Sequence, residues 1–194
     1  MSRVTRACWI SALCLSCSVA GFGQTSASLA TSDTILLLEA EPTAPRLVSL
    51  AVPGQPKWEN ATPETLIPFA EVSGKQFPLA WSFNRDASRI GDQLIAFVYD
   101  SASPRLRLTW EWRARAAFGP IEHQIRIENL GTQEVWIPLQ DSLAFNWKID
   151  PQSSLEHLFV EKGANTPSPV GTHQVALAYG YHWTGTSSTY GDLS

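Results

Sequence analysis

Residues 105–115 read RLRLTWEWRAR, and this stretch decides the fold class. Apolar and polar residues alternate along it, and a strand directs successive side chains to opposite faces. The apolar face carries Leu106, Leu108, Trp110, Trp112 and Ala114. The polar face carries Arg107, Thr109, Glu111, Arg113 and Arg115. The alternation therefore predicts a strand with one buried face and one solvent face.

The next apolar stretch, IEHQIRIENLG (121–131), divides in the same way and completes a hairpin through residues 117–120. Its polar face holds Glu122, Gln124, Arg126 and Glu128, and its mostly apolar face holds Ile121, His123, Ile125 and Ile127. Two registers keep like faces together: Arg115–Glu122 with Glu111–Arg126, or Arg113–Glu122 with Arg107–Glu128. Each opposite-charge pair is worth only about 0.2–1 kcal/mol, so both registers remain open.

Two tryptophans on one strand are able to stack on a sugar ring, or to form part of a core. A one-residue slip that exposed Trp110 and Trp112 would bury charges, and burying one large aromatic side chain contributes about 2–3 kcal/mol. We therefore predict that both tryptophans are core residues. His123 shares their face, where a histidine is usually a hydrogen-bonded structural residue.

The rest of the chain predicts an all-β fold, an antiparallel β-sandwich of the supersandwich type that is incomplete at its C-terminal end. Thirteen prolines and twelve glycines punctuate short apolar runs, and no sustained helical repeat is present. The predicted strands, besides the hairpin, are residues 34–40, 45–54, 66–72, 77–83, 94–100, 135–150, 155–164 and 173–185. Residues 55–65 hold two prolines and predict a loop. We expect one domain over residues 34–194.

The N-terminal residues are typical of a secretory signal peptide, which we place at 1–23 and follow with a flexible leader at 24–33. Arg3 and Arg6 precede a short apolar run that contains all three cysteines. Removal of this segment takes 2 of the 14 basic residues, so 12 remain against 18 acidic ones, a net charge of −6. We expect a cysteine-free secreted or periplasmic protein with no membrane span and no affinity for nucleic acid.

Few residues form a recognisable chemical motif. The four histidines lack zinc-site spacing, and neither a nucleophile elbow nor a phosphate loop is present, so we expect no metal, no cofactor and no catalytic residue. The candidate carbohydrate-binding residues are Trp58, Tyr181, His182, Trp183 and Tyr190. For each of the two regions a packing role stays open as the alternative to binding: Trp58 packs beneath its loop, and Tyr179, Tyr181 and Trp183 point inward from a last strand.

One family resembles this order of strands. Asp100 to Trp110, with its Leu-x-Leu-x-Trp pattern, is followed by a strand that closes on Glu128-Asn129-Leu130-Gly131, and later by GYHWTGTSSTYGD. Residues 35–192 are thus similar to the N-terminal β-supersandwich module of bacterial retaining α-galactosidases. The resemblance implies a secreted glycosidase acting on terminal α-galactosides, whose catalytic carboxylates lie in a following (β/α)₈ barrel. Because this sequence stops at Ser194, no catalytic residue is carried over.

The leading hypothesis is a non-catalytic module that packs on such a barrel, with galactosides as the candidate ligands. The alternative is a free-standing carbohydrate-binding or mutarotase-like exported protein. Mutarotases share the supersandwich and use a histidine and a glutamate as acid and base. His173 or His182 with Glu156 or Glu161 are the residues available for those roles. An exported structural domain without a small ligand is a third possibility.

Overall fold

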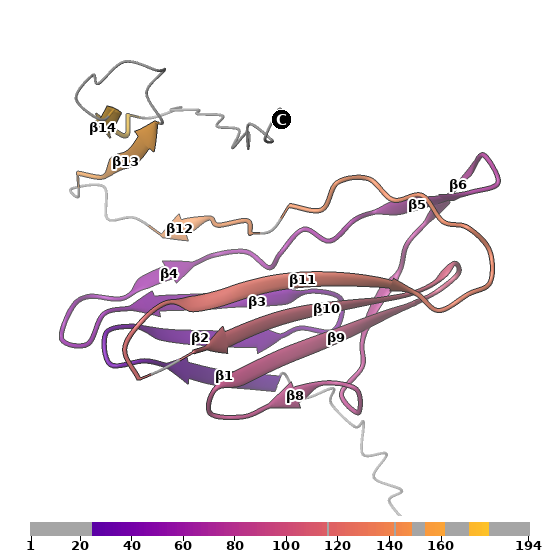
Figure 1. Ribbon diagram of the computed structural model, residues 1–194, viewed down its shortest axis with the longest axis horizontal. Helices are drawn as coiled ribbons and strands as arrows, with labels where there is room; N and C mark the ends of the chain where they lie inside the picture. Colours follow the sequence, from indigo (N-terminus) through magenta and orange to yellow (C-terminus); the bar gives the residue numbers. More distant parts are fainter. Residues whose placement is uncertain (1–24, 116, 142, 149–153, 162–170, 179–194) are drawn as a thin grey trace, which may run out of the picture. The chain divides into compact units, whose positions relative to one another are not determined.

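The computed structural model describes residues 25–115, 117–141, 143–148, 154–161 and 171–178. Its described elements are all β-strands, and every strand pairing is antiparallel (Figure 1). The chain divides between Lys148 and Ile149 into two compact units, where the sequence predicts one domain over 34–194. Within the described residues, no helix is long and apolar enough to cross a membrane.

The first unit is a sandwich of two sheets. Sheet I has the order β1-β2-β3-β4-β12, with the bounds β1 Thr25–Ala30, β2 Ile35–Ala40, β3 Pro45–Ala51, β4 Trp58–Asn60 and β12 Trp147–Lys148. Sheet II has the order β11-β10-β9-β7, and β8 pairs with β9. Its bounds are β7 Trp81–Phe83, β8 Arg89–Ile90, β9 Leu94–Ala102, β10 Arg105–Ala114 and β11 Ile121–Asn129. A ribbon of β5 Phe69–Val72 and β6 Lys75–Pro78 extends from the sandwich. The predicted all-β, antiparallel sandwich class is therefore confirmed.

The core lies between the two sheets because each contributes one apolar face. Sheet I supplies Leu29, Leu36, Leu38 and Leu47, all 2% exposed or less. Sheet II supplies Ile95, Phe97, Tyr99 and the apolar face of β10. Strand β1 lies against β9 and β10, which closes the sandwich on that side.

The predicted apolar face of β10 is confirmed as core. Trp110 is fully buried and Trp112 is 6% exposed. Trp110 stacks on Phe97 with ring centroids 6.0 Å apart, and Trp112 stacks on the His123 ring at 4.3 Å. The His123 Nδ1 lies 2.9 Å from the Glu111 carbonyl oxygen, so this histidine has the expected hydrogen-bonded position.

The hairpin takes the second of the two registers, with Arg113 opposite Glu122 and Arg107 opposite Glu128. The close ion pairs nevertheless form elsewhere. Arg107 binds Asp100 on the neighbouring β9 with two hydrogen bonds of 2.8 and 3.0 Å. Arg113 pairs with Glu111 at 2.9 Å, and Arg115 reaches diagonally to Glu122 at 2.7 Å. Face matching and the turn, rather than directly opposed charges, therefore set this register.

The expected flexible leader at 24–33 needs a correction. Residues 25–30 form β1 and pair with all of β2. Ala27 and Leu29 alternate with serines and point into the core, where Leu29 is fully buried. Small residues therefore pack closely in an edge strand here, and composition alone misreads them as a linker. Residues 1–23, where we predict a signal peptide, lie outside the described residues.

The predicted strand at 135–150 also needs a correction, because only Trp147–Lys148 is strand among its described residues. The segment instead runs antiparallel to residues 60–71, beginning with the Glu71–Trp136 bridge. Farther along, hydrogen bonds to side chains join the two segments. The Ile67 amide donates to the Gln140 side chain at 2.8 Å, and the Ala144 amide donates to the Glu64 carboxylate at 2.9 Å. Pro138 has no amide hydrogen, which favours such irregular pairing over a regular ladder.

The described part of the second unit is one hairpin, β13 Glu156–Glu161 with β14 Gly171–Ala176. Phe159 stacks on the His173 ring with centroids 4.7 Å apart. Predicted strands at 155–164 and 173–185 correspond to these two elements within the described residues.

Candidate functional site

Three aromatic side chains meet at the free end of sheet I. Trp58 and Trp147 pack edge to face, with ring centroids 5.5 Å apart and planes at 84°. Phe145 stacks on Trp147 at 4.8 Å and 21°. Trp58 is 49% exposed and Phe145 is 42% exposed, while Trp147 is half-buried against the core. We call Trp58, Phe145 and Trp147 the aromatic cluster.

A bulge in β3 determines where Trp58 points. The β2–β3 register shifts between Leu37 and Leu38, so that Leu47 opposes Leu38 while Leu50 opposes Leu36. The extra residue lets both Leu47 and Leu50 face the core although they are three positions apart. Trp58 opposes Leu50 in the next pairing and thus lies on the same side of the sheet. The exposed fraction of Trp58 shows that sheet II does not cover this end.

The irregular segment before β12 brings the other two rings to Trp58. Asn60 is buried, and its side chain accepts a hydrogen bond from the Asn146 amide at 2.8 Å. The Ala61 amide donates to the Asn146 carbonyl over the same distance. These bonds set Trp147 opposite Asn60, on the face that Trp58 shares.

Charged groups border the cluster on the other face of the same strands. The Glu59 carboxylate pairs with the Lys57 ammonium at 2.8 Å and with the Lys148 ammonium at 3.7 Å. The hydrogen bond from Lys57 is the main cause that holds the Glu59 pKa below its ordinary value. Two cations therefore share one anion, and the rim carries a net positive charge beside an apolar platform.

Glu64 is the buried carboxyl of this region. It is 6% exposed, its Oε2 accepts from the Ala144 amide, and its Oε1 has no hydrogen-bond partner. Burial is the main cause that raises its pKa to about 7, and the hydrogen bond from Ala144 opposes that shift. Perturbed carboxyls often mark active sites, but this one is closed off from solvent and supports the segment that carries Phe145 and Trp147.

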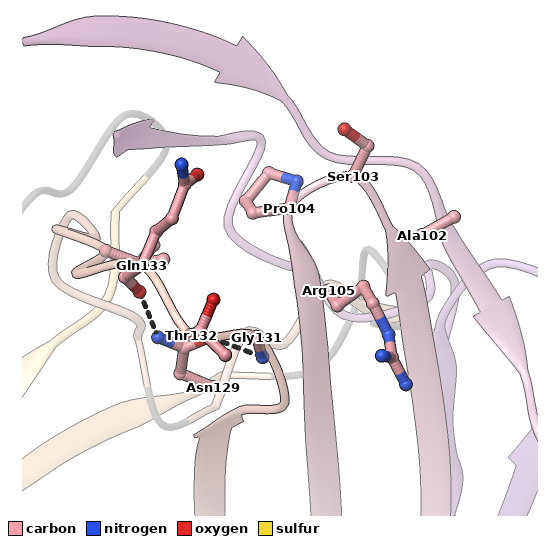
Figure 2. Close-up of a pocket in the computed structure, with 9 residues that line it drawn as sticks. Ala102, Ser103, Pro104, Arg105, Asn129, Gly131, Thr132 and Gln133 are labelled. Atoms are coloured by element: carbon pink, nitrogen blue, oxygen red, sulfur yellow. Dashed lines mark hydrogen bonds between the residues drawn. The ribbon is translucent and has the colours of Figure 1, made fainter. Parts of the chain in front are cut away.

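A separate shallow pocket of about 240 Å³ lies at the β9–β10 turn, as Figure 2 shows. Pro104 and Gln133 line it, and the Arg105 guanidinium points away from Gln133. The Asn129 side chain forms hydrogen bonds within its own turn: it donates to the Gln133 carbonyl at 2.6 Å and accepts from the Gly131 amide at 2.9 Å. The pocket is smaller than an ordinary ligand site of ~300–1,000 Å³, and its best-placed amide is already used.

The sequence-predicted site residues have different outcomes. Trp58 begins the short strand β4 instead of lying in a loop, and half of its surface remains accessible. Tyr181, His182, Trp183 and Tyr190 lie outside the described residues. The mutarotase-type pair His173 and Glu156 lies on opposite faces of the β13–β14 hairpin, since His173 opposes Phe159 while Glu156 opposes Ala176. In the described ranges, no three histidine, cysteine or acidic side chains gather as metal ligands do.

Sequence reasoning missed Phe145 and Trp147 as partners of Trp58. Their alternation predicts a strand and not this contact. The contact with a residue almost ninety positions earlier depends on Asn60, Glu64 and Gln140, whose side-chain bonds carry no local sequence signal.

The chain matches no family model, no curated protein and no solved structure.

Proposed function

We propose that this protein is a non-catalytic β-sandwich module of an exported carbohydrate-active enzyme, and that it binds a galactoside at the aromatic cluster. The observation that carries the proposal is the exposure of Trp58, which is half open although its ring packs on Trp147. A tryptophan that is held by a neighbouring ring and open on its other side is a rigid surface for a sugar.

The energetics of one platform predict weak binding. A tryptophan buries roughly 150–250 Å² in a full contact, so the open half of Trp58 offers about 100 Å². Covering that area with the apolar face of a sugar gains about 2–3 kcal/mol before the entropic cost of association. Hydrogen bonds at the rim must add the rest, and a total near 4 kcal/mol corresponds to a Kd of about 1 mM.

The rim supplies groups suited to hydroxyls. Lys57, Lys148 and Glu59 are solvent-accessible donors and acceptors beside the cluster. The Asn146 side chain is exposed as well and adds an amide. These groups lie on the face of β4 and β12 opposite Trp58, so a sugar that stacks on Trp58 contacts them only where it extends past the edge strand β12.

The non-catalytic assignment and the choice of galactosides rest on the resemblance to the N-terminal sandwich of bacterial retaining α-galactosidases. In that arrangement the chemistry belongs to a barrel, and the sandwich packs on it near the substrate entrance. The inaccessible position of Glu64 supports the same assignment, because the strongly perturbed carboxyl of the described chain does not face a ligand.

Calorimetric titration of the full chain with methyl α-galactoside tests the proposal. We expect saturable binding with a Kd of about 1 mM, and a loss of at least tenfold in Trp58→Ala. Trp136→Ala is the matched control, because Trp136 is 67% exposed and no described ring contact joins it to the cluster. Its affinity should equal that of the unmodified chain.

Two results would overturn the proposal. Binding that is absent, or unchanged in Trp58→Ala, removes the aromatic cluster as the site. Turnover of an aryl α-galactoside by the purified chain contradicts its non-catalytic part.

A further inference from the structure

Strand β11 presents a long unpaired edge. It pairs with β10 over nine residues, and no described backbone hydrogen bond reaches it from its other side. Its register with β10 is continuous, so no bulge turns the edge away. Residues 121–129 also contain neither proline nor lysine, the residues that commonly protect an edge strand from further pairing.

The core-facing side chains of β11 are only partly covered. On β10 the side chains of the apolar face are between 0% and 6% exposed. The corresponding residues of β11, namely Ile121, His123, Ile125 and Ile127, are only partly buried. They pack against the core on the β10 side, and another strand beside β11 would cover their open side.

The side-chain order of β11 is complementary to itself in one antiparallel register. With Gln124 on the two-fold axis, Glu122 opposes Arg126 of the other copy, and this pair occurs twice. On the core-facing side, Ile121 opposes Ile127 and His123 opposes Ile125. Opposite charges and apolar pairs across antiparallel strands each stabilise by about 0.2–1 kcal/mol.

Neighbouring registers lack this match. Centring on Ile125 sets Glu122 against Glu128 twice, and centring on Arg126 sets that arginine against itself. Odd shifts between the strands are excluded because they would mix the polar and apolar faces. Among the described residues, the Arg126 guanidinium forms an ion pair only with Glu128, at 3.8 Å, which leaves room for a closer partner.

We propose that β11 is a homodimerisation edge, at which two copies of this chain pair antiparallel about Gln124 and join their second sheets into one continuous sheet. The contact is isologous, as a two-fold dimer requires. It is independent of the aromatic cluster and of sugar binding.

Sedimentation velocity of the full chain over a range of concentrations tests this inference. We expect a concentration-dependent species of twice the chain mass. Glu122→Arg and Arg126→Glu each create two like-charge contacts across the axis and should raise the dimer Kd at least tenfold. The double variant, with both substitutions, restores opposite charges and should return the Kd to within about threefold of the original.

Arg89→Glu is the control for a charge reversal elsewhere, since Arg89 is exposed on β8 and lies away from this edge. It should leave the dimer Kd unchanged. A chain that stays monomeric at every concentration overturns the proposal. So does a dimer that both single variants leave intact, because its interface must then lie elsewhere.

Hydrogen exchange on the unmodified chain gives a second reading that does not depend on any variant folding. The amides of residues 121–127 that face away from β10 should be protected at high concentration and exchange on dilution. Equal protection in the monomer would mean that another part of the same chain covers the edge, which overturns the proposal.

Discussion

Two pairs of tryptophans in this chain have almost the same geometry and opposite surroundings. Trp110 and Trp112 meet at 5.4 Å and 73°, and Trp58 and Trp147 meet at 5.5 Å and 84°. The first pair is two residues apart in one long strand and is buried; the second joins two short strands and leaves Trp58 half exposed. Ring contact alone therefore does not identify a binding surface. Whether a tryptophan pair is buried or exposed depends on the length of its strands and on how far the opposite sheet covers them.

The strongest test of this comparison removes the buried ring. Trp110→Ala should lower the free energy of unfolding by about 3–5 kcal/mol, because it opens a cavity in the core between the two sheets. Urea denaturation followed by far-UV circular dichroism measures this. Trp110→Phe is the control: it retains most of the volume and removes an indole nitrogen that has no hydrogen-bond partner, so it should cost under about 2 kcal/mol. An Ala variant as stable as the Phe variant would contradict the core assignment.

A second test concerns the buried carboxyl that supports the exposed pair. Glu64 has an ordinary pKa of 4.5, and burial raises it to about 7 in the folded chain. Between these values the folded chain keeps a proton that the unfolded chain releases. The contribution of Glu64 to stability should therefore fall as pH rises from 4.5 to about 7 and then level off, by about 3 kcal/mol in total.

Glu64→Gln should remove this slope while it keeps an acceptor for the Ala144 amide. Unfolding free energies at pH 5 and pH 8 measure the effect: the variant should gain on the unmodified chain at pH 8. If both proteins show the same dependence on pH, Glu64 does not titrate in this window.

A third, smaller effect comes from the ion pair between Asp100 of β9 and Arg107 of β10. Asp100 accepts two hydrogen bonds from Arg107 and one from Asn84 at 2.6 Å. The bond from Arg107 is the main cause that lowers the Asp100 pKa, so its stabilising effect is present above the ordinary value of 3.8 and is lost as pH falls below it.

Asp100→Asn should cost about 1–2 kcal/mol at pH 7 and much less at pH 3, in thermal unfolding at the two values. Arg115→Gln, which loses a pair exposed on both sides and leaves β11 unchanged, is the matched control and should cost under about 1 kcal/mol. Equal losses from both substitutions would show that partial burial adds nothing to the Asp100 pair.

The sequence predicted the buried pair far better than the exposed one, for a physical reason. The apolar and polar residues of β10 alternate over ten positions, and a one-residue slip would bury charges. The residues alone therefore predicted the two faces and limited the hairpin to two registers, between which the structure decides. The position of Trp58 depends on a bulge in β3 and on side-chain bonds from Asn60 and Gln140 to residues more than seventy positions away. Long-range hydrogen bonds of single side chains leave no periodic pattern in the sequence. Strand β1 was missed for a different reason, because its small residues have the composition of a linker.

The smallest stability effect should come from Trp58 itself, and it sharpens the comparison most. Trp58→Ala removes a ring that is already half in water, so its cost in unfolding free energy should stay under about 1.5 kcal/mol, well below that of Trp110→Ala. Trp147→Ala, which removes the ring that Trp58 packs on and that also touches the core, should cost more than Trp58→Ala. Chemical denaturation of the two variants measures this order. If Trp58 mainly stabilised the fold, Trp58→Ala would lower the unfolding free energy more than Trp147→Ala does. If Trp58 mainly forms a ligand surface, Trp58→Ala loses binding while the sandwich remains folded.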